Sequence, residues 1–188
     1  MHFYECRSVD SVLYPIRIAY ALGARILIIT NAAGGVNRNM NPGDLMAITD
    51  QVNMMTEKVP EISFEVKSQF PIYDKTLLTV AQTVSLGLHI QLHKGIYVGV
   101  QGPSYETAAE VEMVSRIGGD AVGMSTVLET TLANVLGMKV LGISCITNKA
   151  TGIGSTKLDH QEVTEAANKV NQEFVRLLRG VIVVLGRG

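Results

Sequence analysis

Tryptophan is absent from this sequence of 188 residues, and aromatic residues make up only 5% of it. Cysteine is also scarce, and the two that occur, Cys6 and Cys145, have no spacing typical of a metal site or a redox motif. We therefore expect two free thiols, with Cys145 behaving as a small hydrophobe inside an apolar strand. A reducing compartment, the cytoplasm, suits such a chain.

The sequence also lacks an excess of charge of one sign, and it lacks long apolar runs. The 16 basic and 17 acidic residues leave a formal net charge of -1, and neither sign forms a run. The longest apolar runs, such as Ile26–Ile29 and Val181–Leu185, are far shorter than the roughly 20 residues that cross a bilayer. The N-terminus has no apolar stretch of the kind found in secretory signals. We therefore expect neither nucleic acid nor a membrane as a partner.

Histidine occurs four times, and no pair of histidines has the spacing of a helical zinc site. We predict no metal centre. His89 and His93 lie in a polar patch and are predicted to be solvated, whereas His160, beside Asp159 at a helix start, has either a capping or a functional role. No Ser-His-Asp or Cys-His nucleophile pattern is evident.

The residues that are abundant indicate an α/β domain. A hydrophobic content of 47% with 18 glycines is typical of a sheet buried on both faces and joined by tight turns. Apolar periodicity and capping patterns predict that helices alternate with strands. The predicted helices are 10–22, 75–86, 107–118, 127–136 and one from 159 onward, and the predicted strands are 26–29, 45–49, 96–100, 121–124 and 140–146. This order implies a mainly parallel sheet in one domain spanning residues 1–188, with 51–70 as an irregular excursion.

Ligands of such sheets bind beyond the carboxyl ends of the strands. The segment Thr30–Gly35 follows a predicted strand and could present backbone N–H groups to an anion, but a tight turn explains its glycines equally well. Tyr105 and Glu106 could stack on and read a planar base, or could be a surface aromatic and a helix-start carboxylate. Asn148 could offer a donor and an acceptor to a base, or could simply form a cap or turn at the end of a strand.

Four motifs taken in order resemble the trimeric class of purine nucleoside phosphorylases. They are Thr30–Gly35, Gly102–Thr107, Asp120–Val127 and Ile146–Lys149, and the similarity runs from His2 into the last helix. The resemblance implies a three-layer fold with a mixed sheet flanked by helices, and a homotrimer. It also implies phosphorolysis of purine nucleosides to free base and pentose 1-phosphate, with inorganic phosphate as co-substrate and no cofactor. Asparagine at position 148 resembles the class that prefers the 6-oxopurine nucleosides inosine and guanosine.

The resemblance also assigns a role to each candidate site residue. Phosphate is expected to contact His2, the backbone amide of Ala32 and the hydroxyl of Ser125. The ribose is expected to contact Tyr4, Met124 and His160, and the base Tyr105, Glu106, Val122 and Asn148. Glu106 and Asn148, with His2 beside the phosphate, are the expected catalytic residues, because the departing purine gains negative charge.

Members of this family carry a further N-terminal segment with a Gly-Ser-Gly phosphate loop, which the resemblance places before Met1. We therefore expect a phosphorylase domain lacking that segment and the first strands of its sheet. The alternatives are a non-catalytic purine- or nucleoside-binding homologue and, less favoured, a methylthioadenosine phosphorylase or a hydrolytic nucleosidase. Phe64 is the candidate for a residue that reaches a neighbouring subunit's site.

Overall fold

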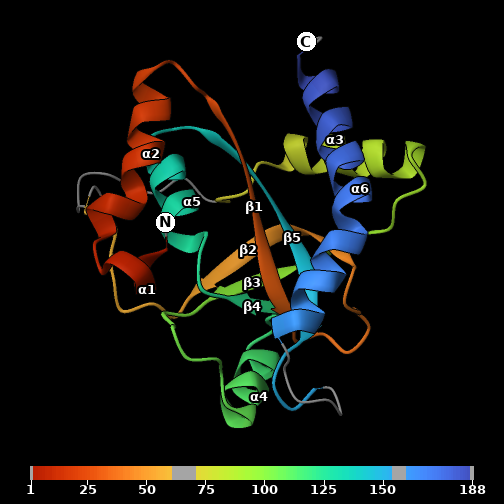
Figure 1. The fold of residues 1–188 in the computed structure, drawn as a ribbon. Coiled ribbons are helices and arrows are strands. Elements are labelled where there is room, and N and C mark those ends of the chain that lie inside the picture. The colour runs from red at the N-terminus through yellow and green to blue at the C-terminus, as the bar shows by residue number, and fades with distance from the viewer. Residues whose placement is uncertain (1, 61–70, 154–159, 187–188) are drawn as a thin grey trace.

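The computed structural model describes residues 2–60, 71–153 and 160–186, and for residues 160–170 it describes the backbone alone (Figure 1). Its helices are α1 (Phe3–Cys6), α2 (Val9–Ala21), α3 (Lys75–Gly87), α4 (Ala108–Arg116), α5 (Val127–Val135) and α6 (His160–Leu185). Its strands are β1 (Ile26–Gly35), β2 (Leu45–Asn53), β3 (Leu92–Gly99), β4 (Ala121–Gly123) and β5 (Lys139–Lys149).

The strands form a mixed, mainly parallel sheet, which confirms the predicted fold class. β1 runs parallel to β5 along its whole length, and β3 runs parallel to both β2 and β4. Two pairings are antiparallel: β2 meets β5 over four residue pairs, and β4 meets the end of β1 at Gly34 and Gly35. The last pairing places the short strand β4 beside the C-terminal end of β1, which also pairs with the C-terminal end of β5.

Helices cover the sheet on two sides, as the three-layer expectation requires. α1, α2 and α5 lie on one side of the sheet, and α3 and α6 lie on the other (Figure 1). The first group encloses a core that includes Leu13, Leu128 and Leu132, and the second packs Leu177 and Val181 of α6 against β5. Burial of these apolar faces supplies the main stabilisation of the fold.

The predicted start of α4 is confirmed in detail. The hydroxyl of Thr107 accepts a hydrogen bond from the backbone N–H of Glu110, and the Glu110 carboxylate accepts one from the backbone N–H of Thr107 at 2.7 Å. These reciprocal bonds satisfy amides that the first helical turn leaves free. The similar pattern at Asp159 lies outside the described residues, as does Phe64.

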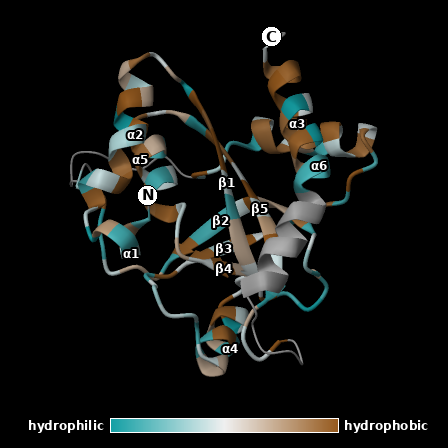
Figure 2. Cartoon of the chain, in the orientation of Figure 1, coloured by the Kyte–Doolittle hydropathy of each residue, from teal (hydrophilic) through white to brown (hydrophobic). Residues whose placement is uncertain are grey.

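Several predicted strand boundaries were wrong because strands continue through residues expected to form loops, including β5, which extends to Lys149 beyond the expected end at Ile146. Thr30–Gly35 is the second half of β1 and pairs with Ile143–Lys149, so it is neither a turn nor a loop. Figure 2 shows the change along β1, whose apolar start gives way to the polar residues Thr30 and Asn31. Gly35 fits there because a Cβ at this position would lie 3.0 Å from the Ile146 side chain. Likewise β2 extends to Asn53, beyond the expected end at Thr49.

His93 differs from its prediction as well. It belongs to β3, its side chain is only 20% exposed, and its Nε2 lies 3.3 Å from a carboxylate oxygen of Asp44. His89 is exposed, as expected. Within the described parts of the chain, no helix combines the length and apolar character needed to cross a membrane.

Candidate functional site

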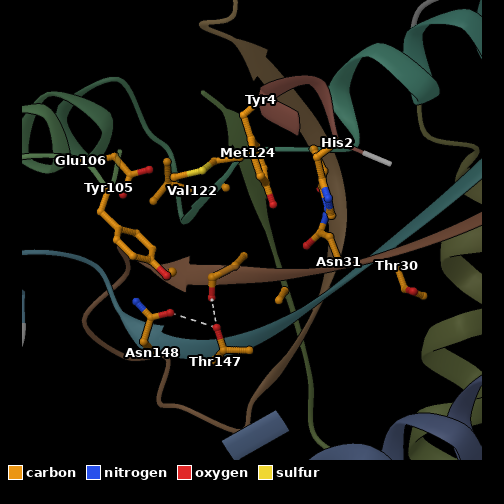
Figure 3. A pocket seen from close by; sticks show the side chains of 15 residues that line it. His2, Tyr4, Thr30, Asn31, Tyr105, Glu106, Val122, Met124, Thr147 and Asn148 are labelled. Carbon is orange, nitrogen blue, oxygen red and sulfur yellow. Dashed lines mark hydrogen bonds between the residues drawn. The ribbon is translucent and has the colours of Figure 1, made fainter. Parts of the chain in front are cut away.

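A cavity of about 340 Å³ opens beside the C-terminal halves of β1 and β5 and the short strand β4 (Figure 3). This volume lies within the range of small-molecule sites, roughly 300–1,000 Å³. The walls come from α1, from β1, β4 and β5 and from the residues that follow β3 and β4. The lining residues are His2, Tyr4, Thr30, Asn31, Ala32, Ala33, Gly34, Tyr105, Glu106, Val122, Gly123, Met124, Ser125, Thr147 and Asn148.

Every candidate site residue except His160 lines this cavity, although the candidates are spread along the chain from residue 2 to residue 148. The side chain of His160 lies outside the described residues. In Figure 3, Tyr105, Glu106 and Asn148 lie toward one end of the cavity, and His2 and Asn31 toward the other. The sequence alone does not single out Asn31 or Thr147, because their part in the site depends on contacts between separate segments of the chain.

Ser125 sits at an unusual turn before α5. The next residue, Thr126, has a φ of 77° and a ψ of -47°, and the backbone N–H of Val127 donates to the Ser125 carbonyl at 2.8 Å. These angles describe a classic γ-turn, which is rare and strained. For a buried β-branched residue such a conformation costs on the order of 1–3 kcal/mol, and surrounding contacts must maintain it.

Asn31 supplies one of those contacts from the neighbouring strand. Its Nδ2 donates to Thr126 Oγ1 at 2.8 Å, and Thr126 Oγ1 lies 3.1 Å from Ser125 Oγ. Asn31 of β1 therefore holds the γ-turn through a side-chain hydrogen bond, and its partner Thr126 Oγ1 also lies within hydrogen-bond distance of the Ser125 hydroxyl.

Tyr97 of β3 contacts the backbone of Ser125. This β3 side chain is fully buried, and its hydroxyl accepts a hydrogen bond from the Ser125 backbone N–H at 3.4 Å. Burial raises the pKa of Tyr97 to about 12, so the hydroxyl is neutral at physiological pH. A Cβ at Gly123 would lie 2.5 Å from this hydroxyl, which explains a glycine two residues before Ser125.

His2 and Tyr4 form the wall contributed by α1. Their rings stack with centroids 5.0 Å apart and an interplanar angle of 13°. The Glu5 carboxylate accepts from the backbone N–H of His2 at 2.6 Å and lies 3.3 Å from His2 Nδ1. The bond from the His2 backbone lowers the pKa of Glu5. A carboxylate at this place favours a proton on the imidazole nitrogen that faces it.

Glu106 and Tyr105 follow β3 at the other end of the cavity. Glu106 is half-buried, and desolvation raises the pKa of its carboxyl, with a smaller contribution from the nearby Glu110. The Tyr105 ring is 55% exposed, which leaves its face open to a planar partner. A perturbed carboxyl beside an accessible aromatic ring in a cavity is typical of a binding site.

Asn148 lies at the same end of the cavity, near the end of β5. Its Oδ1 accepts from the Thr147 hydroxyl at 2.9 Å, and its Nδ2 donates to the Lys149 carbonyl at 2.9 Å. Lys149 is itself fixed, because its ammonium group donates to the carbonyls of Arg38 and Met40 in the segment after β1. The end of β5 is thus anchored to that segment.

Comparison with known proteins identifies the family. Residues 6–183 match the Phosphorylase superfamily. Purine nucleoside phosphorylase 1 of Bacillus subtilis is 46% identical over 187 residues, which covers 96% of this chain and 69% of the relative. The purine nucleoside phosphorylase of Mycobacterium tuberculosis is 38% identical over 182 residues, which covers 97% of this chain and 66% of the relative.

Solved structures agree with this match. A Schistosoma purine nucleoside phosphorylase in complex with guanosine superimposes with a TM-score of 0.88 at 32% identity, covering 97% of this chain and 71% of that one. The Schistosoma mansoni enzyme in complex with inosine gives 0.85 at 31% identity, covering 97% and 69%. Sequence and fold together confirm the resemblance, and the chain belongs to the purine nucleoside phosphorylases of the phosphorylase superfamily.

Proposed function

We propose that this chain catalyses the phosphorolysis of purine nucleosides, preferably inosine and guanosine, to free base and pentose 1-phosphate. The observation that carries the proposal is the single cavity in which a half-buried carboxyl and a fixed carboxamide lie at one end and His2 and Asn31 at the other. Such an arrangement suits a ligand with a planar polar group at one end and an anion at the other. Relatives of this chain were solved with guanosine and with inosine bound.

At the base end, Tyr105 and Val122 would pack against the purine while Glu106 and Asn148 bond to its polar edge. Cleavage of the bond between N9 and C1′ leaves the bonding electrons on the purine, so the base gains negative charge in the transition state. A donor at Asn148 would strengthen its bond as that charge grows, which lowers the barrier. Protonation of the released base completes this half of the reaction.

At the phosphate end, the Ala32 amide, the Ser125 hydroxyl and His2 would hold inorganic phosphate beneath the sugar. The ribose becomes an oxocarbenium-like cation as the base departs, and a phosphate oxygen stabilises it and then forms the new bond to C1′. Ser125 precedes the N-terminus of α5, where backbone amides favour an anion. Tyr4 and Met124, with His160, would contact the ribose. No protein nucleophile is required.

The test is phosphate-dependent release of hypoxanthine from inosine by the purified chain. We expect equimolar hypoxanthine and ribose 1-phosphate, no turnover without phosphate, and full activity after dialysis against a chelator, because no metal or other cofactor takes part. Release that continues at the same rate without phosphate would indicate hydrolysis and contradict the proposal. Purine binding without any product would contradict it too.

We also propose a cytoplasmic homotrimer, as the resemblance implies. Two observations are consistent with this: Cys6 and Cys145 are free thiols, and Tyr14 and Ile18 of α2, with Leu22 directly after it, expose apolar side chains at helical spacing. Apolar side chains repeated along one helix face are typical of surfaces that another protein covers. Sedimentation equilibrium measures the assembly, and a mass of one chain at micromolar concentration would exclude the trimer.

A further inference from the structure

The side-chain amide of Asn148 is held in one of its two orientations. Oδ1 meets the Thr147 hydroxyl and Nδ2 meets the Lys149 carbonyl, each at 2.9 Å. A backbone carbonyl oxygen can only accept hydrogen bonds, and the same is true of the side-chain amide oxygen. Rotating the amide by 180° would therefore bring two acceptors together at Lys149, and would take Oδ1 away from the hydroxyl that donates to it.

Thr147 is itself well fixed. The residue is 4% exposed, lies within β5, and its Oγ1 is also 3.5 Å from the Ala33 carbonyl of β1. A β-branched side chain in a strand has few rotamers, so its hydroxyl stays directed at the neighbouring amide. Thr147 and the Lys149 carbonyl thus act together as a lock on the Asn148 amide.

The locked orientation decides which group faces a bound base. In Figure 3 the amide nitrogen lies on the side of Tyr105 and Glu106, and the oxygen lies on the side of Thr147. Nδ2 carries two N–H groups, of which the bond to Lys149 uses one. The cavity therefore receives an N–H donor from Asn148, while Oδ1 is engaged with the threonine.

Purines differ in what they offer to such a donor. A 6-oxopurine presents two acceptors, N7 and O6, whereas adenine presents the acceptor N7 beside the donor amino group on C6. Asparagine pairs with adenine by using its nitrogen for N7 and its oxygen for the amino group. That pairing needs the amide oxygen to turn toward the base, whereas the lock keeps Oδ1 turned toward Thr147.

We infer that Thr147 is a positioning residue that determines substrate specificity, selecting 6-oxopurines over 6-aminopurines by fixing the Asn148 amide. The inference rests on the proposed function, since it concerns the base-reading end of the same cavity.

Three variants test the lock. Thr147→Val keeps the side-chain shape and removes the hydroxyl, and Thr147→Ser restores it. Ser144→Ala is the matched control, because Ser144 lies in the same strand, is fully buried, and has no hydrogen-bond partner for its hydroxyl among the described residues. The measurement is the ratio of kcat/KM for inosine to kcat/KM for adenosine, together with the ratio of Kd values for hypoxanthine and adenine by calorimetry.

In Thr147→Val the preference for inosine over adenosine should fall roughly fivefold, the effect of one neutral hydrogen bond on discrimination. Thr147→Ser and Ser144→Ala should keep the original ratio. An unchanged ratio in Thr147→Val, or an equal fall in Ser144→Ala, would overturn the inference. If the unaltered chain shows no phosphate-dependent cleavage, the proposed function fails, whereas the Kd ratio for the two bases still decides the role of Thr147.

Discussion

Gly102 and Met124 are in direct contact, because a Cβ added to Gly102 would overlap Met124 Sδ and approach Cγ to 3.1 Å. Gly102 also has a φ of 66°, a conformation that side chains rarely adopt. The backbone after β3 therefore serves as the support for a methionine that lines the cavity. Figure 3 shows Met124 between the two ends of the site.

Gly102→Ala should weaken nucleoside binding by pushing Met124 into the cavity. Overpacking costs about 1–3 kcal/mol, so we expect KM for inosine to rise on the order of tenfold. Gly118→Ala is a close control, because Gly118 has a φ of 89° but open space around the added atom. Both variants should be less stable than the unaltered chain. Steady-state kinetics should show a raised KM for inosine in Gly102→Ala only. Equal KM values in both would show that Gly102 matters for its backbone angle alone.

Asn31→Ala should raise KM for phosphate. The substitution removes the donor that bonds to Thr126 Oγ1 at 2.8 Å, so the γ-turn that carries Ser125 loses its cross-strand support. A neutral hydrogen bond contributes about 1 kcal/mol, which corresponds to roughly fivefold in KM. Asn39→Ala, an exposed asparagine after the same strand, should leave KM for phosphate unchanged. The prediction fails if KM for phosphate stays the same in Asn31→Ala while the variant remains folded.

Titration of Glu106 should produce an acidic limb in the pH profile of kcat/KM for inosine, that is, a decline of kcat/KM as pH falls. Desolvation raises the pKa of its carboxyl, so as pH falls the group becomes protonated at a higher pH than an ordinary glutamate. Protonation removes the acceptor that the base requires, and kcat/KM for inosine should therefore decline on the acidic side. Glu106→Gln should lower kcat/KM and abolish this limb. In Glu110→Gln the limb should persist and move slightly to lower pH, because Glu110 also raises the pKa of Glu106. A profile of Glu106→Gln with the original acidic limb would assign the titration to another group.

Tyr73→Phe should destabilise the chain without changing specificity. The Tyr73 hydroxyl, fully buried, donates to Gln51 Oε1 at 2.7 Å, and the same oxygen accepts from Thr130 Oγ1 at 2.7 Å. Gln51 Nε2 completes the network by donating to Thr131 Oγ1 at 3.1 Å, which ties β2 to α5. Loss of one buried hydrogen bond should lower the free energy of unfolding by about 1–2 kcal/mol, as urea titration measures. Tyr14→Phe, at an exposed position, should have no effect. Equal stability of Tyr73→Phe and the unaltered chain would mean that the network contributes nothing.

The sequence by itself determined the class of fold and most of the candidate site. Apolar periodicity and capping patterns located α2 to α6, since the spacing of buried residues follows directly from helix geometry, but they did not predict the one-turn helix α1. The capping pattern at Thr107 and Glu110 predicted the start of α4, because those bonds form between residues three apart. Four ordered motifs gathered the candidate residues, and all of them except His160 line one cavity.

Tertiary structure alone decided how those residues are held. The small residues of Thr30–Gly35 predict a loop, and only pairing with β5 makes this segment a strand. The hydrogen bonds of a strand depend on a distant partner: Thr30 pairs with Ile143, 113 positions along the chain. The contacts of Asn31 with Thr126, of Tyr97 with Ser125 and of Gly102 with Met124 likewise join separate parts of the chain. Local pattern carries no information on such contacts, since they arise when packing brings distant strands together.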